Sequence, residues 1–210
     1  MNELAIRAGT GVALMAIALV AVVAGGYAFA VLAAAVATAV FYEWTRLTRG
    51  WGATWYGGGF LYALLAALSL LWIRDRADHG LALVLWVFLV TWSTDIGAYF
   101  AGRAIGGPKL APAISPGKTW AGLYGGVAAA TLIGAAWALW NSLPPAILLL
   151  APLFAVAAQG GDLFESWMKR RSGRKDSGTW LPGHGGVFDR VDGLLPVAIL
   201  TAVAAMAGAA

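Results

Sequence analysis

Seven long apolar runs, separated by short polar or glycine-rich breaks, decide what this chain can fold into. In order, the runs cover 8–24, 27–42, 57–73, 80–100, 119–140, 145–162 and 193–209. A helix needs about 20 apolar residues to cross the hydrocarbon of a bilayer, so runs of this length predict membrane-spanning helices. The runs are continuous rather than alternating, which disfavours a transmembrane β-barrel. We therefore expect an all-α polytopic membrane bundle of about seven transmembrane helices with short loops.

The composition agrees with a membrane protein. Of the 210 residues, 60% are hydrophobic and 11% are charged, whereas a soluble domain has about 25% charged residues. The chain has no cysteine and two histidines, which excludes disulfides and thiol nucleophiles and disfavours a His-rich zinc site. The first run resembles a signal peptide, but we interpret it as the first helix because similar runs follow it.

The basic residues are unevenly distributed between the alternate ends of these runs. Counted from the N-terminus, 12 of the lysines and arginines fall on the N-terminal side, and two, Arg74 and Arg76, fall on the other. The positive-inside bias then places the N-terminus and the loops 101–118 and 163–192 in the cytoplasm. We expect a multi-pass protein of the inner (cytoplasmic) membrane, with an interfacial belt of tryptophans near the run ends, Trp44 among them.

Four acids lie in or at the edge of apolar runs, namely Glu43, Asp95, Asp162 and Glu165. A carboxylate near the bilayer centre costs about 2.5–3.5 kcal/mol, so such residues are candidates for function. All four fall toward the cytoplasmic end of their predicted helices, which indicates one polar site. For Glu43, an interfacial carboxylate that faces the headgroups or pairs with Arg46 is at least as good an interpretation.

The stretch 160–170 carries a second signal. If it is helical, Asp162, Ser166 and Lys169 share one face. A carboxylate, a hydroxyl and an ammonium on one face suit a metal–phosphate site, because magnesium shares carboxylate ligands with substrate phosphates. A polar helix end with an internal salt bridge is the alternative.

Residues 183–186, Gly-His-Gly-Gly, form a loop whose backbone amides can approach an anion closely. Asp189 and Asp192 follow it three residues apart and fit one face at the start of the last predicted helix. Acids at a helix N-terminus are also favoured by the helix dipole alone, so helix capping is the alternative interpretation of both.

The segment 106–119 ends in Gly-Lys-Thr, as a nucleotide-binding P-loop does. That motif needs a glycine where Pro112 stands, and we expect no strand before it, so we reject a P-loop. A basic loop stiffened by glycine and proline, with Ser115, Lys118 and Thr119, still suits phosphate binding. An ordinary basic cytoplasmic loop is the alternative.

The segment SWMKRRSGRKDSGTWLPGHGGVFDRVD, residues 166–192, resembles the signature of the phosphatidate cytidylyltransferase (CDP-diacylglycerol synthase) family. Residues 94–122 and 161–166 also resemble that family, so the resemblance covers about 94–193 closely. It implies a nucleotidyltransferase of phospholipid biosynthesis that moves the cytidylyl group of CTP to phosphatidic acid, giving CDP-diacylglycerol and pyrophosphate. It also implies a divalent metal, with Mg²⁺ expected, and the lipid bilayer as partner. We expect no nucleic-acid partner and leave a homodimer open.

By this resemblance, Asp162, Lys169 and Asp189 are expected to be catalytic, and Asp162, Asp189 and Asp192 are expected to hold the metal. The expected substrate-binding residues are Asp95, Ser115, Lys118, Thr119, Ser166, Arg170, Lys175, His184, Gly185 and Gly186. The chain then divides into N-terminal membrane helices at 1–92 and a catalytic membrane region at 93–210.

Two other functions stay open. A membrane transporter or channel would carry charged residues along a path through both leaflets, whereas here the charges collect on one side. A related CTP-dependent transferase could act on another lipid, such as a polyprenol or an ether lipid, because lipid preference is decided at lipid-facing positions that we do not assign.

Overall fold

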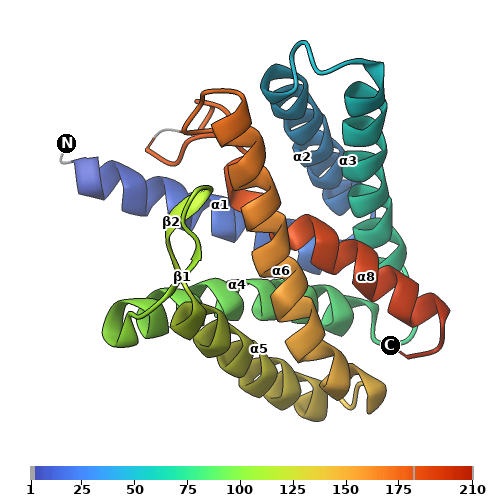
Figure 1. Cartoon of the computed structure of the whole chain (residues 1–210). Helices are drawn as coiled ribbons and strands as arrows, with labels where there is room; N and C mark the ends of the chain where they lie inside the picture. Colours follow the sequence, from blue (N-terminus) through green and yellow to red (C-terminus); the bar gives the residue numbers. More distant parts are fainter. Residues whose placement is uncertain (1–2, 182, 210) are drawn as a thin grey trace.

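The computed structural model describes residues 3–181 and 183–209, with side chains from residue 9 onward, so Arg7 of the basic-residue count lies outside the described side chains. Over this range the chain forms eight helices and one hairpin of two strands (Figure 1). The elements are α1 (Glu3–Ala24), α2 (Gly26–Leu47), α3 (Ala53–Arg74), α4 (Gly80–Ile105), β1 (Lys109–Ala111), β2 (Ser115–Thr119), α5 (Trp120–Trp140), α6 (Ala146–Arg171), α7 (Phe188–Val191) and α8 (Leu194–Met206). Each of the seven apolar runs falls on a helix, which confirms the predicted all-α membrane bundle.

Five of these helices, α2 to α6, are long and apolar enough to cross a membrane. Helices α1 and α8 contribute shorter apolar stretches, Gly9–Ala24 and Leu194–Met206. The 13 residues of α8 rise by about 20 Å, which is less than the hydrocarbon thickness of about 30 Å. The chain is therefore multi-pass, and the count of seven crossings stays a prediction.

Helices α4 and α5 form a close antiparallel pair because small residues line their contact (Figure 1). A Cβ added at Gly97 would lie 2.7 Å from the carbonyl oxygen of Gly125, and one added at Gly126 would lie 2.7 Å from that of Thr94. Small residues of this kind let the backbones of membrane helices approach each other. The α4 segment that carries Asp95 is therefore held firmly against α5.

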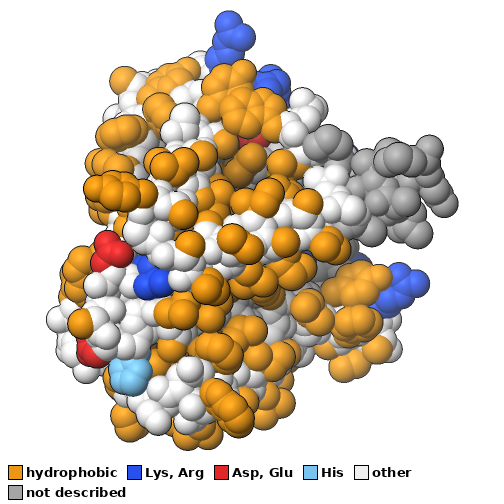
Figure 2. Space-filling model, turned by 180° about the vertical axis from the view of Figure 1, so that it is seen from behind, with side chains coloured by type: hydrophobic (Ala, Val, Ile, Leu, Met, Phe, Trp, Pro, Cys, Tyr) orange, Lys and Arg blue, Asp and Glu red, His pale blue; other side chains and the backbone are white. Residues whose placement is uncertain are grey.

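The outer surface of the bundle is suited to lipid. Figure 2 shows hydrophobic side chains spread over the middle of one face, with charged side chains toward its margins. Large apolar residues are exposed on several of the predicted spans, among them Leu61, Leu65, Leu68, Leu132, Leu139, Leu149 and Leu153. Apolar exposure this extensive marks a surface that contacts lipid or another apolar partner rather than water alone.

The polar loops are shorter than expected because the helices extend into them. Helix α4 continues to Ile105 and α6 to Arg171, so the loops cover 106–119 and 172–187. In the first loop, β1 and β2 pair antiparallel, although no strand was expected there. The Gly-Lys-Thr sequence ends β2 itself, and Pro112 occupies the turn between the strands, so the P-loop stays excluded.

Three segments that are distant in sequence meet at one end of the bundle. The Arg171 guanidinium at the end of α6 lies 4.6 Å from the ring centre of Trp51, which follows α2. The neighbouring Arg170 donates from Nε to the Ile114 carbonyl oxygen at 3.1 Å, between the two strands. The loops that the basic-residue count assigned to one side therefore lie together.

Candidate active site

Lys169 is the centre of a carboxylate cluster at this end of the bundle. Its ammonium lies 2.5 Å from Glu165 Oε2, one helical turn earlier in α6, and 2.7 Å from Asp189 Oδ1 in α7. The Glu165 side chain is completely buried, and that of Lys169 is 13% exposed. Neither Glu165 oxygen has a hydrogen-bond partner of good geometry, so the Lys169 contact is an ion pair without a well-directed hydrogen bond.

The second oxygen of Asp189 is bound by the loop that precedes α7. Asp189 Oδ2 accepts hydrogen bonds from the amides of Gly186 at 2.8 Å and Ser177 at 3.0 Å. Burial acts to raise the pKa of Asp189, but the hydrogen bonds from Lys169 and the Gly186 amide, together with the positive charge of Lys169, outweigh it and lower the pKa to about 2. Asp189 is therefore a carboxylate anion at neutral pH, fixed at both oxygens.

A second ion pair connects the hairpin to α6. Lys118, near the end of β2, lies 2.7 Å from Asp162 Oδ2 and donates to Gln159 Oε1 at 2.6 Å. Ser166 donates to Asp162 Oδ1 at 3.3 Å, which confirms that these two side chains share one helical face. Lys169, predicted on the same face, pairs instead with Glu165 and Asp189, because α7 brings Asp189 within its reach.

Asp192 and Asp95 complete the cluster of acids. Asp192 ends α7 and accepts the amide of Gly193 at 2.8 Å. Burial, followed by the nearby negative charge of Asp162 and that of Asp95, raises the pKa of Asp192. Asp189 and Asp192 were expected at the start of the last helix, but Asp189 lies in the separate one-turn helix α7 and Asp192 is the C-cap of α7. The cluster therefore brings five acids and two lysines together, and neighbouring acids disfavour each other's ionisation.

The other predicted residues occupy less central places. Thr119 is buried and caps α5, since its hydroxyl accepts the Gly122 amide at 3.0 Å. Ser115 lies in β2, and Lys175 is exposed in the loop after α6. The His184 carbonyl accepts a hydrogen bond from Arg190 Nε at 2.9 Å, and its imidazole lies beside α1 at Gly11. Gly185 has a φ of 82°, a conformation that favours glycine.

The sequence analysis included Glu43 and Glu165 in one polar site without assigning either a role, and it omitted one serine. It noted Glu165 as a buried acid but gave it no role, and Ser177 carried no signal. Of the two interpretations of Glu43, the interfacial one is wrong, because Glu43 is completely buried and bonded to the loop before α7. Only the spatial contact with residues more than 130 positions away could have revealed this role. The other interpretation, a functional acid, stays a prediction.

The donor chemistry of the cluster suits a hard divalent cation. Among the described residues, no three His, Asp or Glu side chains are arranged as a ready metal-binding group. Magnesium, however, usually takes only one or two protein carboxylates and completes its shell with substrate phosphates and water. The mutual repulsion of Asp162 and Asp192, and the Glu165 oxygens that lack a directed hydrogen bond, are features that a cation would relieve. Metal binding by Asp162, Asp189 and Asp192 stays a prediction.

An apolar groove of about 840 Å³ opens beside the cluster, between α2, α3, α6 and α8. Its lining consists of Trp44, Thr54, Trp55, Gly58, Tyr62, Ala157, Gly160, Gly161, Phe164 and Pro196. The wall from α6 runs up to Asp162, which follows Gly161 directly. Trp44, expected in the interfacial belt, is only 4% exposed because it packs against neighbouring aromatic rings.

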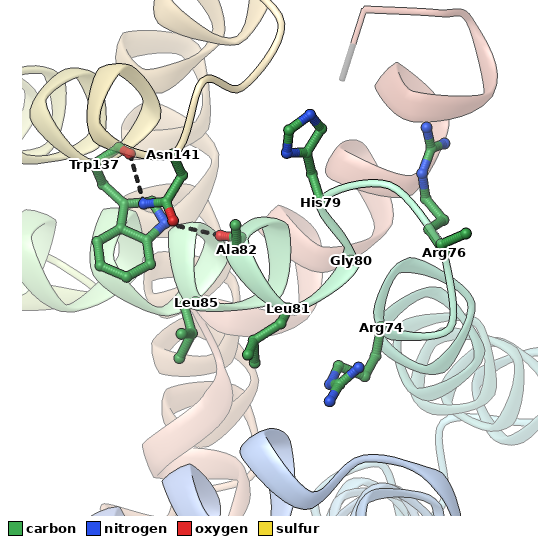
Figure 3. A pocket seen from close by; sticks show the side chains of 10 residues that line it. Arg74, Arg76, His79, Gly80, Leu81, Ala82, Leu85, Trp137 and Asn141 are labelled. Carbon is green, nitrogen blue, oxygen red and sulfur yellow. Dashed lines mark hydrogen bonds between the residues drawn. The ribbon is translucent and has the colours of Figure 1, made fainter.

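A second hollow, of about 430 Å³, lies at the opposite end of the bundle. Figure 3 shows that its polar groups bind one another: Trp137 Nε1 donates to the Ala82 carbonyl and Asn141 Nδ2 donates to the Trp137 carbonyl, both at 2.9 Å. Arg74 donates to the carbonyl of Val22 at 2.7 Å. These groups hold helix ends together, and about 20 Å of helix α4 separates the hollow from the acids.

The fold and the site together define a polytopic membrane protein with a cluster of acids and lysines at one end of its helices, beside an apolar groove. A family model described as the cytidylyltransferase family matches residues 51–207. The chain belongs to the cytidylyltransferase family.

Curated relatives agree with this assignment. A protein of Brucella suis biovar 1 named phosphatidate cytidylyltransferase is 39% identical, with 95% of this chain and 92% of the relative aligned. A protein of the same name from Pseudomonas aeruginosa is 43% identical over 69% of this chain and 55% of its own length. One from Bacillus subtilis is 48% identical over 59% of this chain and 47% of its own length. The Brucella alignment runs over 249 positions, more than the 210 residues of this chain, so that relative carries inserted segments.

Proposed function

We propose that this chain is a phosphatidate cytidylyltransferase, which transfers the cytidylyl group of CTP to phosphatidate and releases pyrophosphate. A phosphate oxygen of phosphatidate attacks the α-phosphorus of CTP. The bond from that phosphorus to the oxygen bridging to the β-phosphate breaks, and pyrophosphate leaves with the bonding electrons. The observation that carries the proposal is the similarity over nearly the whole chain to relatives of that name.

The reaction sets an electrostatic problem that the site is suited to solve. Both substrates are anions, so the nucleophile needs little deprotonation, and the main barrier is the approach of like charges. Lys118 and Lys169 lie about the acids as phosphate-binding cations, and each is held by a carboxylate at 2.7 Å. Ammonium groups fixed in this way neutralise charge without reorganising during the reaction.

A divalent cation completes this proposal. Asp162 and Asp189, with Asp192 as a further ligand, would hold it, and Mg²⁺ is the ion we expect. When bound, the cation neutralises phosphate charge and orients the CTP phosphates. The loop at Gly185 and Gly186 lies against Asp189, whose carboxylate accepts the Gly186 amide, so it is the part of the chain that would face the nucleotide.

The apolar groove is the site that we propose for the acyl chains. It opens among membrane helices and reaches the α6 segment that precedes Asp162, so a lipid there would present its phosphate at the level of the acids. This arrangement fits a lipid whose headgroup lies at the membrane interface. We further propose that this end faces the cytoplasm, where CTP is found, and that the protein resides in the inner membrane.

The test is incorporation of label from CTP into lipid by the protein purified in detergent. We expect label from the α-phosphate of CTP to enter the lipid fraction only with phosphatidate and Mg²⁺ present, and label from the γ-phosphate to leave as pyrophosphate. Asp189→Asn is the matched negative control. Transfer of the γ-phosphate to a lipid would indicate a kinase, and preference for an ether-linked or polyprenyl substrate would indicate a related transferase. Either result would refute the proposal.

A further inference from the structure

Glu43 belongs to α2, before the residues that the family model matches, yet its carboxylate is bonded to the loop that leads into α7. Oε1 accepts the Val187 amide at 3.0 Å, and Oε2 accepts the Phe188 amide at 2.8 Å. The Ser177 hydroxyl donates to Oε2 at 2.7 Å. Three donors therefore offset the cost of burying this charge, and bonds to an ionised acceptor are the stronger kind.

The surrounding loop leaves room for this carboxylate and for nothing larger. Gly178 and Gly186 pack directly against it, and a Cβ at either glycine would overlap a Glu43 oxygen. The loop also contains Gly183 and Gly185, both with positive φ, so its backbone is intrinsically free. An anchor is required if such a segment is to hold one conformation.

Ser177 connects Glu43 to the active site. Its Oγ lies 2.7 Å from Glu43 Oε2 and 3.0 Å from Asp189 Oδ2, and it accepts the Asp189 amide at 3.3 Å. The hydroxyl has a single proton, and the shorter contact assigns that proton to Glu43. The Ser177 amide then holds Asp189 from the other side, at 3.0 Å.

We propose that Glu43 is a positioning residue, which fixes the segments 177–181 and 183–188 so that Asp189 and the Gly185–Gly186 backbone face the phosphates of CTP. This inference rests on the proposed function, since the loop must bind the nucleotide for its position to matter. The role runs through the backbone amides of Val187 and Phe188 and through Ser177. Glu43 itself contacts neither substrate.

The experiment compares Glu43→Gln with the wild type by hydrogen exchange and by steady-state kinetics. A glutamine has the same shape, but one of its two terminal atoms is an NH₂ group, which cannot accept a hydrogen bond. That group must face either the Val187 amide or the Phe188 amide and Ser177 hydroxyl, so at least one hydrogen bond is lost. We expect amide exchange in 177–188 to accelerate by about ten- to hundredfold, the range for losing bonds to a charged acceptor. The KM for CTP should rise at least several-fold, while the KM for phosphatidate stays unchanged.

Two further variants separate positioning from general stability. Ser177→Ala should change the same quantities in the same direction, and it carries the test if Glu43→Gln does not fold. Trp86→Phe removes a buried hydrogen bond to Gly134 far from the loop, so it should lower stability and leave both KM values and the exchange of 177–188 unchanged. Two outcomes would overturn the role of Glu43. In the first, an active Glu43→Gln enzyme shows the wild-type rate of amide exchange in this loop or the wild-type KM for CTP. In the second, Trp86→Phe changes the KM for CTP as much as Glu43→Gln does. Amide exchange can be measured without turnover. A wild-type protein that does not use CTP would therefore refute the proposed function, while the exchange data would still test the contact of Glu43 with the loop.

Discussion

Replacing Lys169 with methionine tests the electrostatic description of the site most directly. Methionine keeps the approximate length of lysine and fills its space, but it removes the positive charge. Lys169 lies 2.5 Å from Glu165 and 2.7 Å from Asp189, with 13% of its side chain exposed. The substitution therefore leaves two buried carboxylates beside each other with no cation between them.

The expected loss of stability follows from that geometry. Removing one partner of a buried ion pair costs about 3–5 kcal/mol, and we expect the lower end because Lys169 keeps some contact with solvent. For a chain of this size, a loss of about 3 kcal/mol lowers Tm by about 6–12 °C. The phosphate-binding cation is lost as well, so kcat should fall by about a hundredfold or more.

The assay is thermal unfolding in detergent, with two matched variants. Lys175→Met removes the same charge at an exposed position and should leave Tm unchanged. The double variant Lys169→Met with Glu165→Gln removes the repelling charge and should recover about half of the lost Tm. A Tm for Lys169→Met equal to that of Lys175→Met, or no recovery in the double variant, would refute the reasoning.

Three smaller predictions follow from neighbouring contacts. Gly161→Ala should destabilise the protein by about 1–3 kcal/mol, because the added Cβ would overlap the Asp192 carbonyl and lie 2.9 Å from Pro196 Cγ. Gly160→Ala is the control: a Cβ added there has no neighbouring atom within 4 Å, so Tm should not fall. Lys118→Met should lower kcat/KM for CTP by about a hundredfold while Lys118→Arg retains most of it, and equal losses would argue against a charge requirement. Thr119→Ala should lower stability by about 0.5–2 kcal/mol through loss of a helix cap, with both KM values unchanged. A raised KM for CTP would instead support the predicted role of Thr119 in substrate binding.

The residues that sequence reasoning identified correctly share one property, which is that their signal is local. Asp162 and Ser166 are four positions apart, so helical periodicity alone placed them on one face. The motif at 166–192 is contiguous, and its resemblance to a known family needs no tertiary information. The hairpin at 106–119 was missed because its prolines and glycines are typical of a stiff loop as well as of a tight turn.

The misinterpreted residues depend on partners elsewhere in the chain. Trp44 was assigned to the membrane interface from its place at the end of a run, but its ring is buried against Phe164 of α6. One interpretation paired Glu43 with its neighbour Arg46, whereas the partners of Glu43 follow more than 130 residues later. Such contacts lie beyond any helical or strand period, so no pattern in the sequence could reveal them.

The amino-acid sequence by itself determined that this chain enters a membrane as helices and gathers most of its charged residues at one end of them. The reason is that both properties are local: the apolar length of a segment determines whether it can cross the membrane, and the basic residues at its ends determine its orientation. Tertiary structure decided which acid meets which lysine, because those pairs form only when α2, α6, α7 and the hairpin are packed together. A buried charge is stabilised by the donors that packing places around it, and their identity depends on the fold as a whole.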